Sequence, residues 1–156
     1  MEGLKRILIY AYGNPGRQDD GLGNCLTDAL DPWLAEKGFT NVQTESNYQL
    51  NIEDADAIAD KDIAVFVDAS IEDIEDIHFG PVEPSEGKSE FTMHAASPAY
   101  VLALCQKIYN KFPETHLLQI RGYEWGFTEG LSEKAENNLG LALEFIKEKI
   151  LSWTSV

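Results

Sequence analysis

Hydrophobic residues along this chain fall into two kinds of segment that alternate. The first kind is a short stretch without helical spacing, which predicts a β-strand, and it occurs at residues 5–12, 40–46, 63–67 and 115–120. In the clearest of these stretches apolar residues do not alternate with polar ones, which is typical of parallel strands buried on both faces. A short edge strand is also expected at 77–79, before Pro81 and Pro84 interrupt strand pairing.

Between these stretches, apolar residues recur at the spacing of amphipathic helices. The clearest such helix has apolar residues at helical spacing from Leu22 to Leu34, and it either includes this last turn or ends or kinks near Leu30 because of Pro32. The other predicted helices lie at about 51–60, after a Ser97 N-cap with Pro98 in the first position, and after a Ser132 N-cap. The helix at 51–60 is expected to bury Ile52, Ala55, Ile58 and Ala59.

The alternation of strands and helices predicts an α/β fold. We expect a single three-layer αβα domain over residues 1–156, with a mostly parallel, twisted five-stranded sheet, helices on both faces and right-handed crossovers. A chain of 156 residues is long enough to bury the core of one such domain. In folds of this kind the functional site lies beyond the carboxyl ends of the strands.

Net charge, apolar stretches and cysteine content limit the possible partners and the cellular location of the protein. A formal net charge of -15, from 27 acidic and 12 basic residues, disfavours binding to nucleic acid or to an anionic membrane surface. No apolar stretch approaches the roughly 20 residues of a membrane span, and the first apolar run is interpreted as a strand rather than a signal peptide. Cys25 and Cys105 lie on apolar helix faces, which favours reduced core cysteines over a disulfide. We therefore expect a cytoplasmic protein.

The glycine-rich segment "GNPGRQDDGLG", residues 13–23, carries the main candidate chemistry. It lacks the sequence of a phosphate-binding loop, and its two adjacent aspartates would repel a phosphate at the start of the helix. Asp19 is expected to cap that helix or to support a neighbouring ligand. A second aspartate adds repulsion, and Gly21 and Gly23 weaken the helix, so the segment favours a cation site in which the glycines clear room for a ligand.

Two residues on the same rim of the sheet would complete a cation site with Asp20. Asp68 directly follows a buried strand, where it either caps the next turn or, as a costly buried charge, is paired or binds metal. His94 lies just before a predicted helix. Together these side chains form an O,O,N set suited to nickel, zinc or manganese, with positions left open for substrate or water. The other two histidines, His78 and His116, are assigned structural or surface roles.

The segments that contain these residues resemble the hydrogenase maturation proteases, endopeptidases that trim the C-terminal extension of nickel-iron hydrogenase large subunits. The matching segments are "YGNPGRQDDGLG", "VFVDAS" and "HAASPAYVLAL", and the resemblance covers nearly the whole chain. "NYQLNIEDA" and "RGYEWGFTEGLS" are most similar to the branch that serves cytoplasmic NAD-coupled bidirectional hydrogenases. The chain departs from the family pattern at Tyr48-Gln49-Leu50, where many members have a glycine-threonine turn.

The resemblance implies a role for each candidate residue. Asp20, Asp68 and His94 would contact nickel already installed in a hydrogenase large-subunit precursor, so that the metal arrives with the substrate and no organic cofactor is needed. The peptide bond would be cut shortly beyond the last metal-binding cysteine of the substrate, with Asp20 or Asp68 as general base for water. A non-catalytic docking protein for the same precursor and, on fold alone, a flavodoxin-like binding module are the alternatives. The sequence does not indicate an oligomeric state.

Two further features could contact such a substrate. The aromatic residues of the loop at 121–130, Tyr123, Trp125 and Phe127, either pack against the domain or form a wall for the substrate tail. Residues 53–90 contain 13 of the 27 acidic residues and are either a solvated face or a region that steers a basic peptide.

Overall fold

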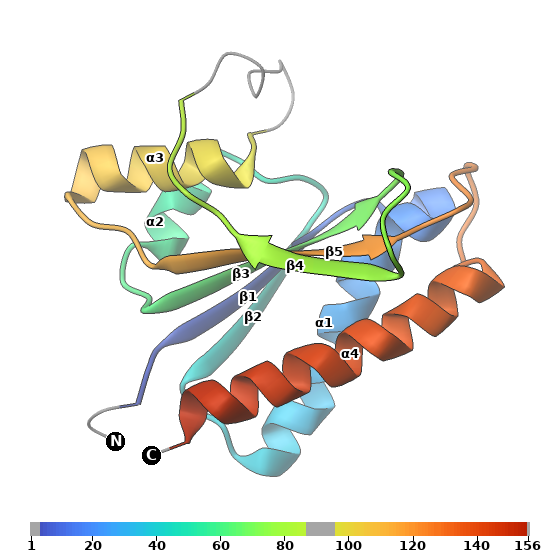
Figure 1. The fold of residues 1–156 in the computed structure, drawn as a ribbon, viewed down its shortest axis with the longest axis horizontal. Coiled ribbons are helices and arrows are strands. Elements are labelled where there is room, and N and C mark those ends of the chain that lie inside the picture. Colours follow the sequence, from blue (N-terminus) through green and yellow to red (C-terminus); the bar gives the residue numbers. More distant parts are fainter. Residues whose placement is uncertain (1–3, 87–95, 156) are drawn as a thin grey trace.

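A five-stranded sheet lies between two layers of helices in the computed structural model, which describes residues 4–86 and 96–155 (Figure 1). The strands are β1 (Ile7–Tyr12), β2 (Val42–Asn47), β3 (Ile63–Ser70), β4 (Ile77–Pro81) and β5 (Glu114–Arg121), in the order β2-β1-β3-β5-β4. The helices are α1 (Leu22–Lys37), α2 (Asp54–Ile58), α3 (Pro98–Tyr109) and α4 (Glu133–Thr154), with a 3-10 segment η1 (Pro15–Gly21). All neighbouring strands pair in parallel except β4, which runs antiparallel to β5, so the predicted α/β fold is confirmed.

The core has two layers because the central strands are buried on both faces. Helices α1 and α4 cover one face of the sheet, and α2 and α3 cover the other (Figure 1). In β3, Val65 and Val67 pack in the layer beneath α1 and α4, whereas Ala64 and Phe66 pack in the layer beneath α2 and α3. Alternate residues therefore point to opposite layers, which explains the continuous apolar run in the sequence.

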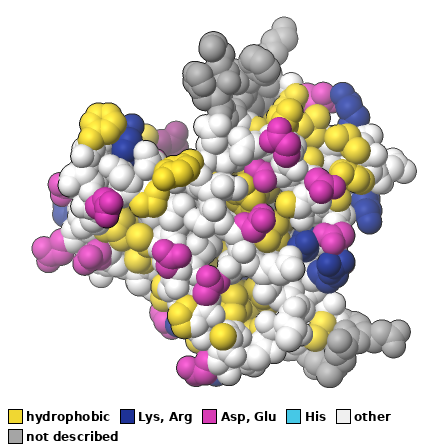
Figure 2. Space-filling view, turned by 180° about the vertical axis from the view of Figure 1, so that it is seen from behind, with side chains coloured by type: hydrophobic (Ala, Val, Ile, Leu, Met, Phe, Trp, Pro, Cys, Tyr) yellow, Lys and Arg dark blue, Asp and Glu magenta, His cyan; other side chains and the backbone are white. Residues whose placement is uncertain are grey.

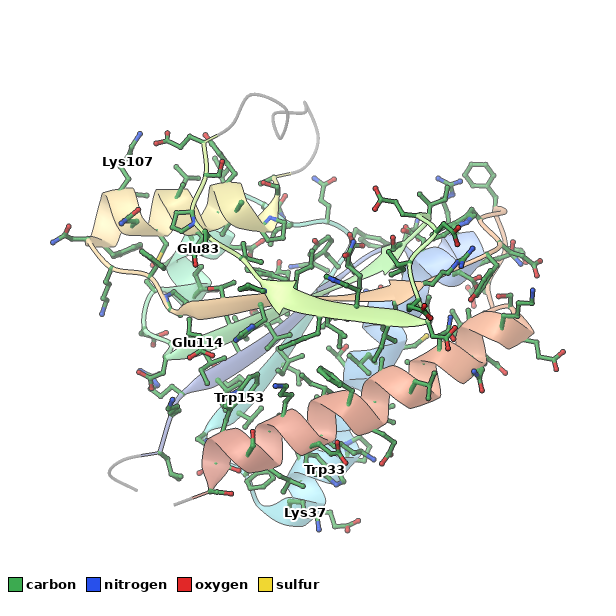
Figure 3. All side chains as sticks on the ribbon, in the orientation of Figure 1. Trp33, Lys37, Glu83, Lys107, Glu114 and Trp153 are labelled. Carbon is green, nitrogen blue, oxygen red and sulfur yellow. The ribbon has the colours of Figure 1, made fainter. Side chains whose placement is uncertain are left out.

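The first helix continues past Pro32 to Lys37, so the spacing of apolar residues to Leu34 is confirmed and the alternative end near Leu30 was wrong. Leu34 is buried beyond the proline, and Trp33 lies near α4, with the Lys147 ammonium 5.6 Å from its ring centroid (Figure 3). Packing of this last turn against the rest of the domain thus outweighs the hydrogen bond that proline removes. The helix ends where Gly38 adopts the left-handed conformation.

Other boundaries differ from the predictions by a few residues. Helix α2 spans five residues and buries Ala55 and Ile58, but Ile52 precedes the helix and is 55% exposed, so its predicted burial was wrong. Strand β3 continues to Ser70, which places Asp68 inside the strand rather than after it. Strand β4 forms the predicted edge strand.

Both cysteines are free, as predicted; Cys105 is buried and Cys25 is half-buried. Among the described helices, none combines the length and apolar character needed to cross a membrane.

The carboxyl ends of β1, β2, β3 and β5 meet at one edge of the sheet because these strands are parallel. We call it the carboxyl edge; in Figure 1 it lies toward the right. The segment between β5 and α4, loop 122–132, lies there with η1, since Asp19 N–H donates a hydrogen bond to the Glu124 carbonyl at 3.0 Å. In an α/β fold of this kind, a functional site is therefore expected at this edge.

Candidate functional site

Asp68 lies near the carboxyl end of β3 and points toward the layer of α2 and α3. The β1–β3 register pairs Ala11 with Val67, so the next residues along, Tyr12 and Asp68, are neighbours on the same face. The Tyr12 hydroxyl donates a hydrogen bond to the Asp68 carboxylate. Sequence reasoning missed Tyr12, although its two-residue spacing from Tyr10 could have placed it on this face.

The environment of Asp68 favours its protonated form. Burial is the largest cause, the negative charge of Asp20 adds to it, and hydrogen bonds from the Ala69 N–H and the Tyr12 hydroxyl oppose both. The result is a pKa of about 7 for Asp68. Two carboxylates that repel each other in this way can be stabilised by a shared proton or by a bound cation. Asp20 and Asp68, two of the three predicted ligands, thus lie close enough to interact.

Asp20 is held by the turn that follows β1. Its Oδ2 accepts a hydrogen bond from the Asn14 N–H at 2.9 Å. The Asp20 carbonyl lies against Gly13 so closely that a Cβ there would be 2.0 Å from the oxygen. Only glycine fits at position 13, and this close approach fixes the position of η1 relative to the end of β1.

Asp19 does not cap α1, so that part of its prediction was wrong. It is fully buried, and its carboxylate accepts hydrogen bonds from the N–H groups of Tyr123 at 2.7 Å and Glu124 at 3.0 Å. The Ser132 N–H and hydroxyl also donate to it, at 2.8 and 2.7 Å. Burial alone would raise the pKa of Asp19, but the bonds from Ser132, Tyr123 and Glu124 outweigh it and lower the pKa. Asp19 therefore anchors loop 122–132 beside Asp20.

Arg17 and Gln18 hold the same loop, and sequence reasoning missed both. Arg17 Nη2 donates to the Trp125 carbonyl at 2.9 Å. The Gln18 side-chain oxygen accepts a hydrogen bond from the Gly126 N–H at 2.8 Å. The backbone N–H of Gln18 donates to the Thr128 carbonyl at 2.9 Å. Gln18 has a φ of 48°, an uncommon conformation that these bonds stabilise. No short-range sequence signal encodes these contacts, because the partners are backbone groups far along the chain.

Gly21 and Gly23 do not clear room for a ligand, contrary to the prediction. A Cβ on Gly21 would lie 2.7 Å from Pro15 Cα, and one on Gly23 would lie 2.9 Å from the Val67 carbonyl oxygen. The space beside each glycine is therefore filled by the protein itself. Gly23 lets the first turn of α1 pack against β3, one residue before Asp68.

His94 lies outside the described residues, so its place in the site stays a prediction. Ala96, two residues later, packs in the layer that includes Tyr12, and its N–H donates to the Leu50 carbonyl at 3.1 Å. Within residues 4–86 and 96–155, no three His, Cys, Asp or Glu side chains form a group that could hold a metal ion.

The other two histidines lie on the strands β5 and β4. The His116 ring stacks between Phe79 at 4.7 Å and Trp153 at 5.7 Å, and its Nε2 lies 2.8 Å from a Glu114 carboxylate oxygen, which confirms a structural role. His78 is exposed on the edge strand β4.

Packing against the domain, one of the two predicted roles, accounts for two of the three aromatic residues of loop 122–132. Tyr123 is half-buried and its hydroxyl accepts a hydrogen bond from Asn138 at 3.0 Å, and the half-buried Trp125 ring packs against Gly122. Phe127 instead is 88% exposed. Packing therefore explains the first two residues but not the third.

No protein-family model matches the chain, and no curated protein matches it in sequence. Solved structures do match. A [NiFe] hydrogenase maturation protease, HycI from Thermococcus kodakarensis, is 23% identical with a TM-score of 0.74, over 97% of this chain and 95% of that one. The hydrogenase maturating endopeptidase HybD from E. coli is 18% identical with a TM-score of 0.70, over 94% and 93%. A hydrogenase 2 maturation peptidase from a Thaumarchaeota archaeon is 20% identical with a TM-score of 0.65, over 94% and 98%. The chain thus has the fold of these proteins.

Proposed function

We propose that this chain is an endopeptidase that removes the C-terminal extension of a nickel-loaded hydrogenase large-subunit precursor. The observation that carries the proposal is the interacting pair of carboxylates, Asp20 and Asp68, at the carboxyl edge of the sheet. Both side chains are half-buried, and a pair of this kind costs stability unless a cation or a proton joins it, so its presence favours a functional role. The shared fold with maturation proteases of nickel-iron hydrogenases supports this choice of substrate.

Nickel belongs to the substrate in this proposal. Asp20, Asp68 and His94 would contact the metal of the precursor, with two oxygen ligands and one nitrogen ligand. A weak and open site suits an enzyme that must test whether its substrate already holds metal. No organic cofactor is required.

Asp68 is suited to proton transfer during hydrolysis. With a pKa of about 7, it exists in both protonation states near neutral pH. Its carboxylate would take a proton from the water that attacks the peptide carbonyl carbon, and would return that proton to the amine nitrogen when the carbon–nitrogen bond breaks. Asp20, held by the Asn14 N–H, is the alternative base.

The resemblance of "NYQLNIEDA" and "RGYEWGFTEGLS" to one branch of the family favours the precursor of a cytoplasmic NAD-coupled bidirectional hydrogenase as the substrate. The protein would then act in the cytoplasm. The net charge of -15 agrees with a protein partner and disfavours nucleic acid.

Cleavage of a purified precursor tests the proposal. The nickel-loaded precursor should release a short C-terminal peptide, detected as a mass change, whereas the nickel-free precursor should stay intact. Asp20→Asn, Asp68→Asn and His94→Ala should each abolish release, and Asp31→Asn, an exposed aspartate on α1, should not. Cleavage that persists in the three site variants would overturn the mechanism. Binding of the precursor without any mass change would instead identify a non-catalytic docking protein.

A further inference from the structure

The most exposed large hydrophobic side chains of the described residues gather at the carboxyl edge. They are Phe127, Ile71 and Tyr48, with exposed fractions of 88%, 76% and 75%. Tyr48 and Ile71 directly follow β2 and β3, and Phe127 lies in the loop that follows β5. Single exposed hydrophobic residues are normal on a protein surface, but a group at the edge that carries the site is not explained by chance exposure.

The strand order places these side chains on both sides of the carboxylate pair. Tyr48 follows β2, the strand at one side of the sheet, and Phe127 follows β5. Between them lie β1, which leads into the Asp20 turn, and β3, which carries Asp68. With adjacent strands about 4.8 Å apart, the ends of β2 and β5 are separated by about 14 Å. A protein surface seated on this edge would therefore contact the apolar side chains and reach the carboxylates together.

Phe127 is exposed but not loosely held. The Arg17 guanidinium lies over its ring at 4.6 Å from the centroid. Arg17 in turn donates to the Trp125 carbonyl, and Gln18 binds the backbone of Gly126 on one side and of Thr128 on the other. A side chain fixed in this way loses little conformational entropy on binding, which is typical of an aromatic residue that contributes strongly at an interface.

Acidic residues lie close in sequence to two of the three apolar residues, Ile71 and Phe127. Glu72 and Asp73 follow Ile71, and the exposed side chains of Glu124 and Glu129 lie on either side of Phe127 in sequence. In Figure 2, where this edge lies toward the left, acidic and hydrophobic side chains are interspersed over that end of the molecule. The complementary partner surface therefore carries apolar side chains on both sides of the segment that reaches the carboxylates, with Lys and Arg around those side chains.

From these observations we infer that Tyr48, Ile71 and Phe127 form a docking surface for the folded precursor, whose contacting face is apolar with surrounding basic residues. The inference rests on the proposed function and adds to it the contacts that position the substrate beside Asp20 and Asp68. Phe127 and Ile71 contribute to substrate affinity and take no part in bond cleavage. Substitution should therefore change KM and leave kcat close to the wild-type value.

The test compares Phe127→Ser and Ile71→Ser with Ile108→Ser. Ile108 is 63% exposed but lies near the carboxyl end of α3, away from the carboxyl edge, so it is a matched control. We expect Phe127→Ser and Ile71→Ser each to raise KM for the nickel-loaded precursor about tenfold and to leave kcat within about twofold of the wild-type value. The control, Ile108→Ser, should change neither constant. Phe127→Leu, which keeps an apolar contact, should retain most of the affinity. Raising the salt concentration should weaken wild-type binding.

Three outcomes would overturn the inference while the wild-type protein still cleaves the precursor. The first is a KM that is the same for Phe127→Ser, Ile71→Ser and Ile108→Ser. The second is a loss confined to kcat. The third is a wild-type dimer in sedimentation experiments that Phe127→Ser dissociates, which would assign the surface to self-association. A wild-type protein that does not cleave the precursor would instead contradict the proposed function. Circular dichroism on each variant shows whether it is folded.

Discussion

The Tyr12 hydroxyl donates a hydrogen bond to Asp68 across the β1–β3 pair. This bond stabilises the ionised carboxylate, so it lowers the pKa of Asp68, against the larger effect of burial and the added effect of the Asp20 charge. The Ala69 N–H also donates to Asp68 and lowers its pKa, and the balance of the four effects is a pKa of about 7, where the group exchanges a proton near neutral pH. Tyr12 thus lowers the pKa of Asp68 through a hydrogen bond between neighbouring strands.

Replacing Tyr12 with Phe removes this hydrogen bond and should raise the pKa of Asp68 further. If Asp68 acts as the base, the rising limb of the pH–rate profile for precursor cleavage should move upward by about one pH unit, and the rate near neutral pH should fall about threefold to tenfold. Tyr10→Phe is the control, because the Tyr10 hydroxyl donates to Asp54 at 2.7 Å. An unchanged profile in Tyr12→Phe would exclude Asp68 as the group that titrates in the reaction.

Asp68→Asn should make the folded protein more stable at alkaline pH while it abolishes cleavage. An aspartate with a pKa near 4 when unfolded and about 7 when folded binds more protons in the folded state, so folded-state stability falls as pH rises between these values. The neutral amide removes that loss, and we expect a gain of about 2 to 4 kcal/mol near pH 8 that nearly vanishes near pH 4. Urea unfolding at both pH values measures the difference. A gain of equal size at both would contradict the raised pKa.

The alternation of segments was sufficient to predict the sheet, because strands buried on both faces, such as β1 and β3, must be continuously apolar. It also located Asp68, since a carboxylate at the end of a buried run stands out in the sequence. It could not predict the partners of Asp19, because these are N–H groups more than a hundred residues away whose positions depend on the folded loop. The sequence pattern also does not distinguish a glycine that leaves space for a ligand from one that lets a neighbouring strand pack closely, as Gly23 does with β3.

Asp19→Asn should destabilise the protein by about 3 kcal/mol at neutral pH. Both carboxylate oxygens of Asp19 accept hydrogen bonds from N–H or O–H groups, and the amide nitrogen that replaces one oxygen cannot accept them. The pKa of Asp19 is lowered in the folded protein, so its contribution is complete above about pH 4 and is lost as the pH falls further. The difference from wild type should therefore narrow in acid. Asp31→Asn, at an exposed aspartate that accepts a bond from Thr44, should cost less than about 1 kcal/mol. Equal losses in the two variants would show that the Asp19 bonds contribute little.

Gly23→Ala and Gly140→Ala should have opposite effects, although both glycines lie inside helices. A Cβ at Gly23 would meet the Val67 carbonyl oxygen at 2.9 Å and Ala11 Cβ at 3.2 Å, so α1 would have to move away from β3. We expect a loss of about 1 to 3 kcal/mol and, because β3 carries Asp68, weaker precursor cleavage. Nothing lies within 4 Å of a Cβ at Gly140, so alanine there should stabilise α4 by up to about 1 kcal/mol. Thermal and urea unfolding of both variants measure these changes, and a Gly23→Ala protein as stable as Gly140→Ala would mean that α1 and β3 do not pack this closely.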